Sequence, residues 1–132
     1  MSLGISYTPS AGTPVYDILL TKFTDNALPR VYDSSLNYGQ SVTGASVLTG
    51  PAFTQKYIWT ISCHLTKTQA IELDAMFQAW DQDRSNGLSA AVGLIDRTFG
   101  PEVNTSALFS TPPSYVYYSA SLVIATFGLS EV

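Results

Sequence analysis

The chain has 132 residues, a mass of 14.2 kDa and a formal net charge of −4, which suits a single domain with one core. Charged residues make up only 12% of the chain and hydrophobic residues 45%, so neither a charged disordered tail nor a phosphate-binding surface fits the composition. No apolar run reaches the length of about 18 residues that a membrane-spanning helix needs, and we expect neither a membrane nor a nucleic-acid partner.

In the first part of the chain, one strand is predicted between two extended segments. Glycine and proline among Ser and Thr indicate an extended N-terminal arm over residues 1–14. Residues 15–23 alternate in part and predict a strand, and Pro29 limits the segment after it to an edge strand or a loop. Residues 33–51 have few apolar anchors and are long for a connection. We expect a functional loop or a mobile arm there.

The clearest strand prediction covers residues 55–65. A period of two places apolar side chains on one face of this strand, and Thr60, Ser62 and His64 on the other. We therefore expect a buried face. Its residues are Tyr57, Trp59, Ile61, Cys63 and Leu65.

A helix is predicted directly after this strand. Thr66 and Gln69 have the spacing of a capping box, and Asn86-Gly87 is a natural helix end. Apolar residues then recur with the period of 3.6 that puts them on one helix face, so we expect Trp80 to be buried, as we expect for Trp59. The residues on the apolar face are Ala70, Leu73, Phe77 and Trp80.

The last third of the chain predicts two more strands with a loop between them. Residues 88–97 have the pattern of a strand in which Asp96 begins to face solvent, and residues 99–113 predict a loop because they are rich in Gly and Pro. Residues 115–129 predict a long strand, apolar on both faces, that packs under two layers or against a partner subunit. The elements together predict one mainly β domain over residues 1–132, a β-sandwich or barrel with one α-helix packed across it.

The sequence offers little equipment for catalysis or metal binding. His64 is the only histidine, with no predicted nucleophile or carboxylate within hydrogen-bond reach, and the single cysteine, Cys63, is most simply a small core residue. Asp81 begins a stretch that is superficially like a calcium-binding loop. However, Asn86 stands where that loop needs glycine, and Val92 where it needs glutamate. We expect no catalytic residue, no cofactor and no metal site.

Tyrosine is abundant, with eight residues, and three of these lie between two serines near the C-terminal end. Tyr and Ser together are favoured on surfaces that bind other proteins, but Tyr is also a good strand former. Ordinary strand packing and a protein interface both remain open for these residues. The candidates for core or interface positions are Trp59, Phe77, Trp80, Tyr115, Tyr117 and Tyr118.

A longer pattern over residues 57–97 is shared with a known family. It runs from an alternating strand with a tryptophan, through a Leu-Thr step, into a helix, and then through a glycine to a strand that ends in aspartate. The residues of this pattern are Tyr57-Ile58-Trp59-Thr60-Ile61, Leu65-Thr66, Gln69-Ala70, Leu73, Phe77, Gly87 and Leu94-Ile95-Asp96. Their order resembles the small barrel-type domain of bacteriophage minor tail and distal tail proteins.

The resemblance implies a structural role in the virion. A chain of this family would be a tail tube, tail tip or baseplate subunit that self-assembles into a homo-oligomeric ring, contacts other tail proteins and is assembled in the host cytoplasm. Residues 1–14 and 33–51 would then be contact arms that order on assembly. The alternative is a small carbohydrate-binding β-sandwich module, which predicts a monomer with Trp59 or Trp80 exposed as a sugar platform.

Overall fold

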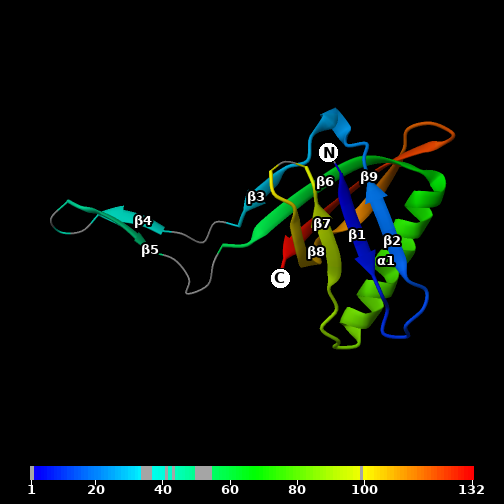
Figure 1. Cartoon of the computed structure of the whole chain (residues 1–132), viewed down its shortest axis with the longest axis horizontal. Coiled ribbons are helices and arrows are strands. Elements are labelled where there is room, and N and C mark those ends of the chain that lie inside the picture. Colours follow the sequence, from blue (N-terminus) through cyan, green and yellow to red (C-terminus); the bar gives the residue numbers. More distant parts are fainter. Residues whose placement is uncertain (1, 34–36, 41, 43, 50–54, 99) are drawn as a thin grey trace.

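The computed structural model describes all residues except 1, 34–36, 41, 43, 50–54 and 99. Seven of the described strands form one antiparallel sheet in the order β2-β1-β7-β8-β9-β6-β3, with a helix packed against it and a separate two-stranded ribbon, β4-β5 (Figure 1). The predicted class, mainly β with one α-helix packed across the strands, is confirmed. The elements are β1 (Leu3–Tyr7), β2 (Tyr16–Leu20), η1 (Thr24–Asn26), β3 (Arg30–Tyr32), β4 (Asn37–Gln40), β5 (Ser46–Thr49), β6 (Tyr57–Thr66), α1 (Lys67–Ser85), β7 (Val92–Asp96), β8 (Val103–Tyr117) and β9 (Leu122–Glu131).

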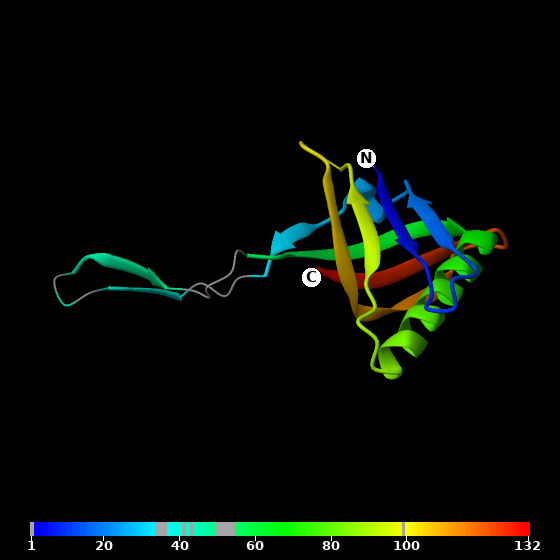
Figure 2. The ribbon, with the colours of Figure 1, turned by 60° about the horizontal axis from the view of Figure 1, so that its bottom comes forward.

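The seven-stranded sheet curls until its two ends meet. After β2 the chain returns to one edge of β6, where Phe23 pairs with Cys63 and the His64 amide donates to the Lys22 carbonyl oxygen at 2.7 Å. β3 continues along the same edge of β6. The strands therefore enclose a common core as an incomplete barrel, and α1 lies along one side against β2, β6, β8 and β9 (Figure 2).

The alternation predicted for residues 55–65 is confirmed in β6. Trp59, Ile61, Cys63 and Leu65 are buried, and the residues between them are half-buried or exposed. Tyr57, predicted on the same face, is only half-buried. β6 pairs with β9 along almost its whole length. The apolar face of β6 therefore forms the centre of the core.

The helix begins and ends close to the predicted residues. Thr66 accepts a hydrogen bond from the Gln69 amide at 3.2 Å, and the Gln69 side chain accepts one from the Thr66 amide at 3.1 Å, so the capping box is confirmed. Gly87, just after the helix, has a φ of 80° that favours glycine. In the part of the chain that the structure describes, no helix has the length and apolar character needed to cross a membrane. The apolar face of α1 carries Ala70, Leu73, Met76 and Trp80, with Phe77 half-buried beside them.

The prediction of an extended N-terminal arm over residues 1–14 is wrong for Leu3–Tyr7. These residues form β1, which lies inside the sheet between β2 and β7, with Leu3, Ile5 and Tyr7 buried. The alternation is that of a strand, but it is short and is outweighed by the glycine and prolines that follow it. Those turn-forming residues belong to the connection between β1 and β2.

The predicted loop over residues 99–113 and the predicted strand over residues 115–129 both have the wrong bounds. β8 runs through most of the predicted loop, and β9 begins only after a turn at residues 118–121. Pro112-Pro113 fits inside β8 because its register with β9 shifts at that point, so the ladder does not need the missing N–H groups. The C-terminal part of the chain is a long β8–β9 hairpin.

Within residues 33–51 the described residues form a β-hairpin. β4 and β5 pair with each other in antiparallel register, and Figures 1 and 2 show this ribbon extending along the long axis of the molecule, away from the barrel and α1. We call the described residues 37–40, 42 and 44–49 the arm. Residues of the predicted loop that lie outside the described residues are 34–36, 41, 43, 50 and 51.

Candidate functional site

The groups that the sequence singled out for chemistry lie apart. Cys63 is buried, as predicted, and burial raises the pKa of its thiol to about 12, which keeps it protonated and unreactive. His64 packs its ring edge-on against Tyr118, with centroids 5.4 Å apart. Asp81 forms an exposed ion pair with Arg84 at 2.6 Å. Among the described residues, no three His, Cys, Asp or Glu side chains gather closely enough to hold a metal ion.

Asp96 is fully buried, which corrects the expectation that it begins to face solvent. Its carboxylate accepts hydrogen bonds from Arg30 Nη1 and Trp59 Nε1, both at 2.9 Å, and from the amide and hydroxyl of Thr98 at 2.9 and 2.6 Å. Burial alone would raise the pKa of Asp96. The hydrogen bonds from Thr98 and Trp59 and the charge of Arg30 outweigh burial and hold the pKa below its usual value. The ionised carboxylate thus joins β7 to β3 and β6.

These contacts lie at the root of the arm, where the chain leaves the barrel and returns to it. Tyr32 ends β3 and Tyr57 begins β6, and their rings stack with centroids 4.6 Å apart and hydroxyls 3.0 Å apart. The Arg30 guanidinium lies over the Tyr57 ring at 4.9 Å. One step further out, the Asp33 amide donates to the Lys56 carbonyl oxygen at 2.8 Å. The two strands that carry the arm are therefore held together at its root.

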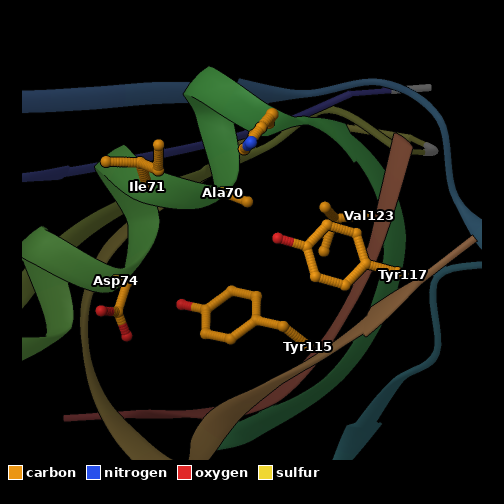
Figure 3. Close-up of a pocket in the computed structure, with 7 residues that line it drawn as sticks. Ala70, Ile71, Asp74, Tyr115, Tyr117 and Val123 are labelled. Carbon is orange, nitrogen blue, oxygen red and sulfur yellow. The ribbon is translucent and has the colours of Figure 1, made fainter. Parts of the chain in front are cut away.

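At the other end of the molecule, α1 and the β8–β9 hairpin border a groove of about 320 Å³ (Figure 3). Helix residues form one wall and hairpin residues form the other, and the lining is mainly apolar. We call it the α1–hairpin groove. Its residues are Lys67, Ala70, Ile71, Asp74, Tyr115, Tyr117 and Val123.

A buried hydroxyl without a partner lies in this groove. Figure 3 shows the Tyr115 hydroxyl and the Asp74 carboxylate turned toward each other, yet the hydroxyl oxygen is buried and has no hydrogen-bond partner. Burial raises the pKa of Tyr115 above its ordinary value, and so do the negative charge of Asp74 and the attraction of its carboxylate for the hydroxyl proton. A buried polar atom that lacks a partner is unfavourable.

The tip of the β8–β9 hairpin exposes large side chains. Val116 is 62% exposed, Tyr117 74% and Tyr118 65%. Strands of a soluble monomer ordinarily place polar or charged residues in such positions. Of these three, Tyr117 lines the α1–hairpin groove, whereas Tyr118 packs against His64.

The other core or interface candidates lie inside the molecule. Trp59 and Trp80 are both buried, which confirms that prediction. Phe77 is half-buried in a cluster with Trp80 and Phe109. Its ring centroid lies 5.9 Å from that of Trp80 and 5.2 Å from that of Phe109. The centroids of Trp80 and Phe109 are 5.2 Å apart. Tyr115 is half-buried against the core. The interface role of the exposed tyrosines remains a prediction.

Both ends of the molecule belong to stretches without charge, a feature that our reasoning from the sequence did not use. None of the six basic and ten acidic residues falls within residues 34–55, which contain the arm, or residues 103–130, which contain most of the β8–β9 hairpin. The arm exposes Val42 and Leu48. The two charge-free runs are visible in the sequence, but only the fold places the arm and the hairpin tip at opposite ends (Figure 1).

No protein-family model matches the chain, and no curated protein matches it. The surfaces of the chain itself are therefore the basis for the functional conclusion.

Proposed function

We propose that the chain is a structural subunit of a bacteriophage tail, in the tail tube, tail tip or baseplate, that assembles with copies of itself into a ring and contacts other tail proteins. One observation carries the proposal: the molecule has two apolar, charge-free surfaces, the arm and the β8–β9 hairpin tip, at opposite ends of its long axis (Figure 1). The pattern over residues 57–97 that resembles tail proteins supports the choice of virion.

A charge-free surface suits a lasting contact between proteins. Taking a charged side chain out of water is costly unless it finds a partner of opposite charge, and the centres of interfaces are depleted of Asp, Glu and Lys and enriched in Tyr. Tyr117 and Tyr118 at one end and Leu48 at the other are exposed. Contact between copies would remove this apolar surface from water.

The two surfaces differ in shape, so a contact between them joins copies head to tail. The arm is a two-stranded ribbon, whereas the opposite end is a groove between a helix and a hairpin. A repeated contact of this kind closes into a ring when the rotation between copies allows it, and otherwise it extends into a tube or filament. Rings and tubes are the forms that a tail subunit requires.

The carbohydrate-binding alternative needed an exposed tryptophan. Trp59 is 0% and Trp80 5% exposed, and both indole nitrogens donate within the protein, Trp59 to Asp96 at 2.9 Å and Trp80 to the Ala90 carbonyl oxygen at 3.2 Å. Neither ring can serve as a sugar platform without opening the core. These positions count against the alternative.

Sedimentation velocity over a concentration series, with negative-stain images of the heaviest species, tests self-assembly. We expect closed rings of one copy number, or tubes that grow from them. An antibody against the chain should then label the tails of particles that contain it. A 14.2 kDa monomer at every concentration would contradict the proposal, and glycan binding by that monomer would favour the alternative. Labelling of heads alone would contradict the tail assignment.

A further inference from the structure

We infer that the arm of one copy binds in the α1–hairpin groove of the next copy. This assignment rests on the proposed function for the fact of self-assembly, and it adds which two surfaces meet. The occupant of the groove is a second copy of this chain.

The arm cannot fill the groove of its own chain. Figures 1 and 2 show the arm and the start of α1 at opposite ends of the longest dimension, with the barrel between them. The stack of Tyr32 on Tyr57 and the hydrogen bond from Asp33 to Lys56 hold the root of the arm to the barrel. Any contact between arm and groove therefore needs two copies.

The arm gains stability from a partner. A lone two-stranded hairpin is at best marginally stable in water, and β4 and β5 form a sheet of their own. Val42 and Leu48 are exposed on the arm, and the outer edges of a ribbon present backbone groups that can pair with another molecule. A groove that takes in this ribbon would cover both its apolar side chains and part of its edge.

The charges of the groove favour an uncharged segment such as the arm. The groove carries one charge of each sign, Lys67 and Asp74, around the apolar side chains of Ile71 and Val123. A charged segment would lie near one like charge there, whereas residues 34–55 carry no charge and meet neither repulsion nor the cost of burying a charge. The body of a neighbouring copy would bring charged residues, because all sixteen ionised Lys, Arg, Asp and Glu side chains lie outside the two charge-free runs.

The Tyr115 hydroxyl distinguishes this groove from another large groove, which we call the second groove. That second groove, of about 450 Å³, lies near Trp80, Leu88 and Val132, and the indole nitrogen of Trp80 is already bonded to Ala90. In the α1–hairpin groove the Tyr115 hydroxyl has no partner. The arm has carbonyl oxygens along its edges and can supply one once the side chains that cover the hydroxyl move aside.

Two variants with one blocked surface each test the assignment. Leu48→Asp puts a charge on the arm, and Ile71→Asp puts one in the groove; the native side chains are 62% and 64% exposed, so we expect both variants to fold, which circular dichroism would verify. Leu88→Asp is the matched control, because Leu88 is exposed and lines the second groove. Sedimentation velocity reads the mass of each sample.

We expect each blocked variant alone to lose its oligomers and sediment as a monomer. An equimolar mixture should give a dimer of twice the 14.2 kDa monomer mass and nothing larger. In this dimer the intact arm of the Ile71→Asp copy binds the intact groove of the Leu48→Asp copy. The two surfaces that remain free are both blocked, so no third copy can bind. Leu88→Asp should assemble like the native chain.

The inference is overturned if either blocked variant still assembles alone, or if their mixture stays monomeric. If rings persist in those variants, the proposed function stands and only the arm-in-groove assignment fails. If the native chain never associates, both fail. If the mixture gives dimers but the native chain forms only open filaments, the assignment stands and the ring fails.

Discussion

At the root of the arm, the buried carboxylate of Asp96 accepts hydrogen bonds from Arg30, Trp59 and Thr98, whereas in the α1–hairpin groove the Tyr115 hydroxyl is buried with no partner. The first end uses its polar groups to hold β3, β6 and β7 together beneath the arm. The second leaves the Tyr115 hydroxyl without a partner. Both ends expose apolar side chains, so the two ends differ in how their polar groups are used.

The largest effect should come from breaking the first end. Asp96→Ala removes the carboxylate that pairs with the Arg30 guanidinium, whose side chain is only 6% exposed, and Trp59 loses its acceptor. We expect the free energy of unfolding to fall by about 3–5 kcal/mol, measured by urea denaturation. Glu102→Ala removes the exposed partner of Arg97 and should cost at most about 1 kcal/mol. Equal losses in the two variants would contradict the special role of Asp96.

Alkaline pH should weaken the barrel that connects the two ends. Burial raises the pKa of the Cys63 thiol from 9.0 to about 12, so the folded chain keeps a proton that the unfolded chain releases. The contribution of the protonated thiol to the free energy of unfolding is complete below pH 9. It is lost as the pH rises toward 12, at about 1.4 kcal/mol per pH unit. Urea denaturation of Cys63→Ala should show a shallower loss than the native chain. The pKa of Tyr7 is also raised to about 12, but both chains contain Tyr7, so it does not affect the comparison. If the unfolding free energies of the two chains fall in parallel as the pH rises, the assignment to the thiol is wrong.

Removing a polar group in the α1–hairpin groove should increase the stability of the chain. Tyr115→Phe deletes the buried hydroxyl that has no partner and should raise the free energy of unfolding by about 1 kcal/mol. Tyr117→Phe, at an exposed position, should change it by less than about 0.5 kcal/mol. If Tyr115→Phe is destabilising in the isolated chain, the hydroxyl has a partner within its own molecule, and the contrast between the two ends disappears.

The smallest effect concerns the stacked tyrosines at the root of the arm. Tyr32→Ala removes the ring that stacks on Tyr57 with centroids 4.6 Å apart and should cost about 0.5–1 kcal/mol. Val31→Ala, on the same strand and exposed, is the control and should be close to neutral. Thermal unfolding of the two variants distinguishes the contribution of the stack from that of an ordinary edge-strand residue.

The parts of the fold that could be predicted from the sequence are those with long, periodic signals. β6 alternates cleanly through Trp59 and Cys63, and the capping box at Thr66 marks the change to a helical period. The sequence did not predict β1 because its alternation is short. It did not predict β8 because Pro112-Pro113 indicates a loop unless the shift in register with β9 is known.

The polar network and the placement of the two ends depend on contacts between distant segments. Asp96 lies 66 residues from Arg30 and 37 from Trp59, so no local pattern indicates that it is buried with them. The charge-free runs, residues 34–55 and 103–130, could have been noticed in the sequence. Their arrangement at opposite ends follows only from the way the strands pair.

The most direct test of the central claim is a disulfide between two copies. A Leu48→Cys copy is mixed with an Ile71→Cys copy, oxidised, and analysed by mass spectrometry, while the native Cys63 stays buried and protonated. The account predicts mixed dimers joined through positions 48 and 71, and none when Leu88→Cys replaces Ile71→Cys. Dimers made of two Leu48→Cys copies, or equal cross-linking at position 88, would contradict it.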